Sequence, residues 1–123
     1  MSRIKKKKDE EPGQQAVLGM LHYGEPLYWE ERYKEDFRKM IGWENFDWYA
    51  PFELVYPIIE STVDLTGDQR ILLLGCGRSS AAEFLYKKGF RSITCIDVSE
   101  TVIVKMSQHY DGLAGVEWIT MDG

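Results

Sequence analysis

Residues 71–80, with the sequence ILLLGCGRSS, are the most informative stretch of this chain about its fold. Four apolar residues run directly into Gly-Cys-Gly, and helix-forming residues follow at 81–86, so the pattern predicts a strand, a tight turn and a helix start. An uninterrupted apolar run is typical of a strand that is covered on both faces in a parallel sheet. Gly75 and Gly77 allow backbone angles and a close approach that a side chain would block.

The next predicted strand bears on what lies over this turn. Two glycines occur in such turns for steric reasons alone, so a bound ligand and a merely compact turn are both consistent with residues 75–77. The second strand, residues 92–96, ends at Asp97, 22 positions after Gly75. An acid at about this spacing can accept hydrogen bonds from both hydroxyls of a ribose. Asp97 also precedes Ser99, a predicted helix N-cap, so a role in starting that helix alone remains the alternative.

The third glycine of a dinucleotide-binding turn is missing. Ser80 stands three positions after Gly77, where the Gly-x-Gly-x-x-Gly pattern requires glycine. The turn is therefore better suited to a nucleoside without a diphosphate, such as S-adenosylmethionine (SAM).

Four stretches of the sequence together resemble one family. They are YWEERY at 28–33, FDWY at 46–49, LGCGRS at 74–79 and WITMD at 118–122. With them the chain resembles the first half of a class I SAM-dependent methyltransferase. More narrowly, it is similar over residues 25–123 to the methyltransferase-like group that contains lysine methyltransferases of elongation factor 1A. Two positions depart from the pattern: Arg78 stands where the group usually has asparagine, and Leu73 where many class I enzymes have an acid, although this group tolerates leucine.

The resemblance implies an α/β, Rossmann-like class I methyltransferase fold with three parallel strands in the order 3-2-1 and flanking helices. We expect the strands at residues 71–74, 92–96 and 116–120, and the helices at 26–41, 50–64, 81–88 and 100–110, with Pro57 kinking or dividing the second helix. Sheets of this class have seven strands, so these three form an incomplete sheet. The unpaired edge of the first strand is expected to promote self-association, unless a partner covers it or the chain is a fragment of a larger enzyme.

Two regions are expected along the chain. Residues 1–24 are predicted to be a disordered tail and loop, because a basic run at residues 5–8 passes at once into acidic sequence with proline and glycine. Residues 25–123 are predicted to be the N-terminal, cofactor-binding half of a methyltransferase domain.

The resemblance also implies the residues that bind SAM. They are Trp29, Tyr33, Trp48, Gly75, Gly77, Asp97, Val98, Asp122 and Gly123. Trp29, Tyr33 and Trp48, called the aromatic cap below, would surround the methionine end, where aromatic faces attract cations. Asp97 would hold the ribose, Val98 would pack on the adenine, and Asp122 would accept a hydrogen bond from the adenine amine. Spacing alone leaves alternatives: Trp29 and Tyr33 as part of a helical core stripe with Phe37, and Asp122 as a solvent-facing turn residue.

Composition limits the classes of function. The 123 residues carry a formal net charge of −5, which disfavours a nucleic-acid partner. There is no apolar run of the length that a membrane span needs, and Cys76 and Cys95 are predicted to be reduced thiols of a cytoplasmic protein. No cluster has the spacing of metal ligands, and neither His22 nor His109 stands where it identifies a general base, so the catalytic residue stays unassigned.

The function predicted from these features is SAM-dependent methylation of protein lysine, with elongation factor 1A as the protein substrate that the resemblance implies. In such a transfer the protein mainly aligns the nucleophile, the methyl carbon and the sulfur. Two alternatives stay open: a small-molecule methyltransferase, and a non-catalytic half-Rossmann module that binds or interacts.

Overall fold

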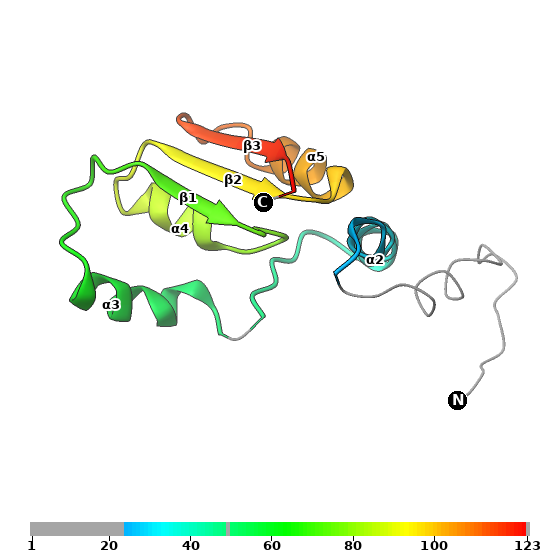
Figure 1. The fold of residues 1–123 in the computed structure, drawn as a ribbon, viewed down its shortest axis with the longest axis horizontal. Coiled ribbons are helices and arrows are strands. Elements are labelled where there is room, and N and C mark those ends of the chain that lie inside the picture. The colour runs from blue at the N-terminus through cyan, green and yellow to red at the C-terminus, as the bar shows by residue number, and fades with distance from the viewer. Residues whose placement is uncertain (1–23, 49, 123) are drawn as a thin grey trace, which may run out of the picture.

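A computed structural model describes residues 24–48 and 50–122, which form a three-stranded sheet with helices beside it (Figure 1). The elements in chain order are α2 (Pro26–Lys39), α3 (Phe52–Thr62), β1 (Ile71–Leu74), α4 (Ala81–Lys87), β2 (Ile93–Asp97), α5 (Glu100–His109) and β3 (Val116–Thr120). The strands are parallel, in the order β1-β2-β3. The predicted α/β, Rossmann-like class with strand order 3-2-1 is confirmed. The predicted tail lies outside the described residues, apart from Gly24.

The two faces of the sheet differ in burial. Along β1, Leu72 and Leu74 are 55% and 64% exposed, whereas Leu73 between them packs against the core. The prediction that β1 is covered on both faces is therefore wrong for the described residues. The reason is topological. Both crossovers, β1-α4-β2 and β2-α5-β3, step in the same direction across the sheet, and right-handed crossovers then place α4 and α5 on one face.

The core lies between this covered face and the two crossover helices. Val102 and Met106 of α5 are fully buried in one cluster with Ile93 and Cys95 of β2. Burying a side chain of this size contributes about 1.5–3 kcal/mol, so the sheet and α5 form one stable unit. Ser99 caps α5 as predicted, because its hydroxyl oxygen accepts a hydrogen bond from the Val102 N–H at 3.2 Å.

Helix α3 continues unbroken through Pro57, which the sequence left open. Phe52 and Tyr56 pack on Phe84 of α4, with ring centroids 5.6 and 5.1 Å apart, and this contact holds α3 against the outside of α4. Proline cannot donate a hydrogen bond to the carbonyl four residues earlier, which here belongs to Glu53. Glu53 is exposed, so water can take the place of the missing donor.

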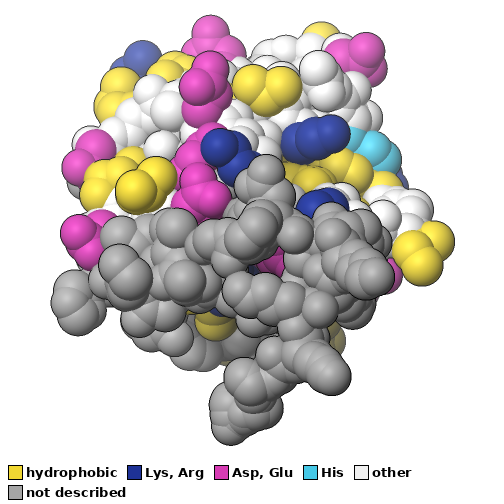
Figure 2. All heavy atoms as spheres, turned by 90° about the vertical axis from the view of Figure 1, so that its right-hand side faces the viewer, with side chains coloured by type: hydrophobic (Ala, Val, Ile, Leu, Met, Phe, Trp, Pro, Cys, Tyr) yellow, Lys and Arg dark blue, Asp and Glu magenta, His cyan; other side chains and the backbone are white. Residues whose placement is uncertain are grey.

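Helix α2 lies beyond the carboxyl ends of the strands and packs beside α5 (Figure 1). Tyr33 is buried, and Trp29 and Phe37 pack against the core cluster from the same face, so the predicted stripe is confirmed. On the side of the molecule seen in Figure 2, acidic and basic side chains are interspersed with hydrophobic ones. Helix α2 thus closes the end of the sheet at which ligands bind in parallel α/β folds.

Self-association is the first testable consequence. Among residues 24–48 and 50–122 no strand pairs the outer edge of β1, and Leu72 and Leu74 are exposed beside it. We expect the purified chain to associate in sedimentation velocity, and Leu72→Lys with Leu74→Lys to reduce the association, because charges on an exposed strand oppose edge-to-edge pairing.

The matched control is Leu73→Lys. It places a charge on the covered face, where it should lower the unfolding temperature. It should not reduce the degree of association. A wild-type chain that stays monomeric at every concentration would contradict the expectation.

Candidate functional site

The glycine turn after β1 is held directly against the end of β2. Gly75 and Gly77 have φ angles of +62° and +47°, in the left-handed region that favours glycine. Between them, the Cys76 N–H donates to the carbonyl of Ile96 at 3.0 Å, and the Gly77 N–H donates to the Asp97 carboxylate at 2.9 Å. The turn is therefore a fixed loop, and its position depends on the acid at the end of β2.

Asp97 joins this turn to the start of α5. One carboxylate oxygen accepts from Gly77, and the other accepts from the Ser99 N–H at 3.0 Å. The helix-start role is thus present in the structure. Each carboxylate oxygen can accept a second hydrogen bond, so the predicted ribose role is compatible with it and stays a prediction.

Tyr33 of α2 fits against Gly77. The Tyr33 hydroxyl lies where a Cβ atom on residue 77 would stand, well inside van der Waals contact. Burial first, and then the nearby Asp97 charge, raises the pKa of Tyr33, so the phenol is neutral at physiological pH. The close fit ties the position of α2 to that of the glycine turn.

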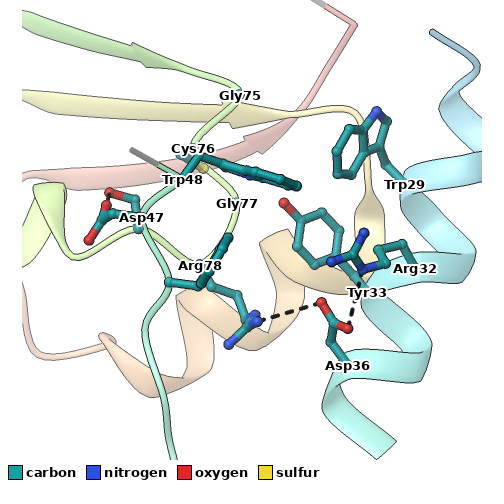
Figure 3. A pocket seen from close by; sticks show the side chains of 12 residues that line it. Trp29, Arg32, Tyr33, Asp36, Asp47, Trp48, Gly75, Cys76, Gly77 and Arg78 are labelled. Atoms are coloured by element: carbon teal, nitrogen blue, oxygen red, sulfur yellow. Dashed lines mark hydrogen bonds and ion pairs between the residues drawn. The ribbon is translucent and has the colours of Figure 1, made fainter. Parts of the chain in front are cut away.

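Two adjoining cavities open around this contact. The first, of about 260 Å³, is lined by Trp29, Arg32, Tyr33, Asp36, Phe46, Asp47, Trp48, Gly75, Cys76, Gly77, Arg78 and Ser79 (Figure 3). The second, of about 450 Å³, is lined by Trp29, Tyr33, Trp48, Leu74, Gly75, Ile96, Asp97, Val98, Met121 and Asp122. Both share the aromatic cap and Gly75, so one elongated ligand can extend through the two.

The aromatic cap forms the boundary between the cavities. Trp29 meets Trp48 edge to face, with ring centroids 6.0 Å apart and planes at 87°, and Trp29 lies 6.0 Å from Tyr33. Figure 3 shows Trp29 and Tyr33 projecting from α2 toward Trp48 and the glycine turn. Trp48 is 58% exposed, and its ring also contacts Phe46, with centroids 5.2 Å apart, and lies 5.8 Å from the Arg32 guanidinium.

The two cavities differ in charge. In the first, two arginines, Arg32 and Arg78, stand against two acids, Asp36 and Asp47, and Asp36 lies between the two guanidinium groups, 3.4 Å from Arg32 and 3.5 Å from Arg78. The described residues lining the second include Asp97 and Asp122 and no lysine or arginine. The first cavity thus offers guanidinium donors to an anionic group of a ligand beside two acids, and the second offers acceptors to hydrogen-bond donors.

Two further acids attach the cap segments to the starts of helices. Glu30 of α2 accepts hydrogen bonds from Ser99 and Thr101 at the start of α5. Burial alone would raise the pKa of Glu30, but these hydrogen bonds outweigh burial and lower it, so the carboxylate is charged at neutral pH and the contact is lost only in acid. Asp47 accepts from the hydroxyls of Ser79 and Ser80 just before α4.

All the predicted site residues that the structure describes line one cavity or both. Gly123 lies outside the described residues, and Asp122 is exposed, as its solvent-facing alternative also requires. Sequence reasoning missed Glu30, Arg32, Asp47 and Arg78, although each stands inside a stretch that carried the resemblance. Charged residues beside the cap tryptophans were the signal that could have identified them.

The described histidine, His109, is exposed and stacks on Trp43 with ring centroids 3.8 Å apart, away from both cavities. His22 lies outside the described residues. Within the ranges that the structure describes, no group of three potential ligands could hold a metal ion, and no helix has the length and apolar character that a membrane crossing requires.

The contact between Tyr33 and Gly77 yields a second prediction. Gly77→Ala should cost about 1–2 kcal/mol for a left-handed backbone angle and about 1–3 kcal/mol more for the overlap with Tyr33. Tyr33→Phe removes the overlapping oxygen, and the next nearest atom, Cζ, would lie 3.4 Å away, so it should recover the second part in the double variant. Urea unfolding measures each free energy.

Gly75→Ala is the matched control. Its φ angle is also left-handed, but nothing lies within 4 Å of the added Cβ, so it should cost the backbone part alone. Equal losses of unfolding free energy in Gly75→Ala and Gly77→Ala would show that Tyr33 moves aside at little cost.

Comparison with known proteins points to one group. The chain is 31% identical to EEF1A lysine methyltransferase 4 of Mus musculus over 100 residues, which is 81% of this chain and 37% of that protein. It is 31% identical over 86 residues (70% of the chain) to the eEF1A lysine and N-terminal methyltransferase of Homo sapiens, and 37% identical over 76 residues (62% of the chain) to that of Danio rerio. Each of these two matches spans 11% of the relative.

No protein-family model matches the chain. The similarity to enzymes named for eEF1A lysine methylation agrees with the resemblance that the motifs carry, while the chain spans well under half the length of these relatives.

Proposed function

We propose that this chain, a relative of eEF1A lysine methyltransferases, binds SAM in the two adjoining cavities and acts as the cofactor-binding part of a methyltransferase. The relatives support a methyltransferase function through their names. The observation that carries the cofactor assignment is that an acidic cavity adjoins one that contains two arginines, with three aromatic residues between them.

This charge distribution favours one orientation of SAM across the two cavities. The methionine carboxylate would lie in the first cavity near Arg32 and Arg78, whose guanidinium groups also pair with Asp36. The ribose hydroxyls would donate to Asp97 in the second cavity. The adenine would pack on Val98, with its amine toward Asp122. A dinucleotide fits less well, because Ser80 stands where the turn of a dinucleotide site has its third glycine.

The aromatic cap would then face the sulfonium. Aromatic faces attract a desolvated cation by about 0.5–2 kcal/mol, and Trp29, Tyr33 and Trp48 line both cavities where they meet. When bound, SAM supplies the electrophilic methyl group. The contribution of this chain is to hold the cofactor in one orientation and to exclude water from one side of it.

The acceptor in this proposal is a lysine of a protein, with eEF1A as the candidate because the relatives are named for it. A cytoplasmic place of action belongs to the same proposal. Its support is that Cys76 and Cys95 are both buried and free, as reduced thiols are.

A second candidate is a non-catalytic SAM-binding module. It is favoured by one observation: His109, the histidine of the described residues, lies away from both cavities, so no histidine among these residues can remove the proton of a lysine nucleophile.

The cofactor assignment can be tested by calorimetric titration. We expect SAM and its demethylated product, S-adenosylhomocysteine (SAH), to bind more tightly than NAD. Asp97→Asn should weaken both by about 10–100-fold, because charged hydrogen bonds to the ribose are worth about 1.5–3 kcal/mol each. Asp111→Asn, an exposed loop acid, is the control and should leave both affinities unchanged. Tighter binding of NAD than of SAM would contradict the proposal.

A transfer assay with methyl-labelled SAM separates the candidates. We expect label to appear slowly on lysine of eEF1A and not on small amines, with Asp97→Asn abolishing the transfer at low SAM concentration. SAM binding without transfer to any acceptor would favour the non-catalytic module. Label on small amines alone would point to a small-molecule methyltransferase.

A further inference from the structure

We propose that Glu30 and Asp47 are positioning residues for the aromatic cap: each acid fixes the tryptophan next to it by binding the start of a helix that packs on the sheet. The inference rests on the proposed SAM site, because it concerns how two walls of that site are held. It assigns a task to Glu30, which lines neither cavity, and to Asp47, which lines the first.

The first attachment joins α2 to α5. Oε1 of Glu30 accepts hydrogen bonds from the Ser99 hydroxyl at 2.7 Å and the Thr101 N–H at 3.1 Å, and Oε2 accepts from the Thr101 hydroxyl at 2.5 Å. The carboxylate thus satisfies a backbone donor in the first turn of α5 and lies at the positive end of its dipole. Trp29 is the neighbour of Glu30 in sequence, so the attachment fixes the backbone from which the indole projects.

The second attachment joins the segment before α3 to α4. Oδ2 of Asp47 accepts from the Ser80 hydroxyl at 2.9 Å and lies 3.5 Å from the Ser80 nitrogen, and Oδ1 accepts from the Ser79 hydroxyl. Ser80 immediately precedes α4. Asn45 strengthens the same contact, because its side-chain amide donates to the Arg78 carbonyl at 3.0 Å. Trp48 follows Asp47 in sequence.

The two attachments have the same design although they lie far apart in the chain. In each, a carboxylate adjacent to a cap tryptophan bonds to hydroxyl and backbone N–H groups at a helix start, and the two indoles meet edge to face. Trp48 is 58% exposed, and its ring meets Trp29 and Phe46 and lies 5.8 Å from the Arg32 guanidinium, so its position depends on the two segments that carry these residues. Removing either carboxylate should let one indole leave the boundary between the cavities.

A positioning role can be distinguished from a general loss of stability. Only SAM carries the sulfonium cation, whereas SAH has a neutral sulfur, so misplaced cap rings should weaken SAM more than SAH. A variant that merely destabilises the fold should weaken both ligands equally.

The experiment measures SAM and SAH affinity by calorimetry for Glu30→Gln and Asp47→Asn. We expect about a tenfold loss for SAM and about a twofold loss for SAH in each variant. In a Trp29→Ala background, Glu30→Gln should cause no further SAM-specific loss, because its effect passes through the missing ring. Equal losses for the two ligands, or an undiminished SAM-specific loss without Trp29, would overturn the inference.

Glu100→Gln and Glu44→Gln are the matched controls. Glu100 is an exposed acid in the same first turn of α5, and Glu44 is an exposed acid in the same segment as Asp47, so both variants remove one charge without removing an attachment. Neither should change the ratio of SAM to SAH affinity.

Amide hydrogen exchange of the free protein keeps this inference separate from the proposed function. Glu30→Gln should speed exchange across residues 26–39, and Glu100→Gln should not. If the wild-type chain binds neither SAM nor SAH, the proposed function fails, and faster exchange in Glu30→Gln still supports the attachment. Unchanged exchange in Glu30→Gln would overturn it whether or not the ligands bind.

Discussion

The Asp97 carboxylate is the interaction on which the arrangement of the site depends. It is 6% exposed and accepts one backbone N–H from the glycine turn and another from the start of α5. A buried carboxylate is stable only where such donors meet it, so the charge fixes the distance between the glycine turn after β1 and the N-cap of α5. The other contacts of the site build outward from that distance: Tyr33 fits against Gly77, and Glu30 reaches the next donors of the same helix.

The parts of the fold that could be predicted from sequence are those that depend on local pattern. An apolar run ending in two glycines predicted β1. Strand composition predicted β3, and capping chemistry predicted Ser99 as the N-cap of α5. The exposure of Leu72 and Leu74 could not be predicted from local sequence pattern. A strand of four apolar residues looks the same whether one face or both are covered, because coverage depends on where later crossovers pass.

The residues of the candidate site could be predicted from sequence, whereas the contacts between their side chains could not. The motif stretches identified the residues that line the cavities, because motifs record which residues approach a ligand. They did not reveal the pairing of Glu30 with Ser99, since a hydrogen bond across 69 positions leaves no periodic signal. Arg78, which stands where the group usually has asparagine, adds further contacts to the site. Its guanidinium pairs with Asp36 of α2 and donates to the Glu44 carbonyl at 2.8 Å, so it links the turn to both segments that carry the cap.

The sheet and the cap also differ in how far apart along the chain their contacts lie. Each strand pairs with the next one in sequence, so the sheet can form by a series of short loop closures. The hydrogen bond between Glu30 and Ser99 instead closes a loop of 69 positions. The Glu30 carboxylate can bind all its donors only after the first turn of α5 has formed. We therefore expect the cap to assemble last during folding, on a sheet that is already formed.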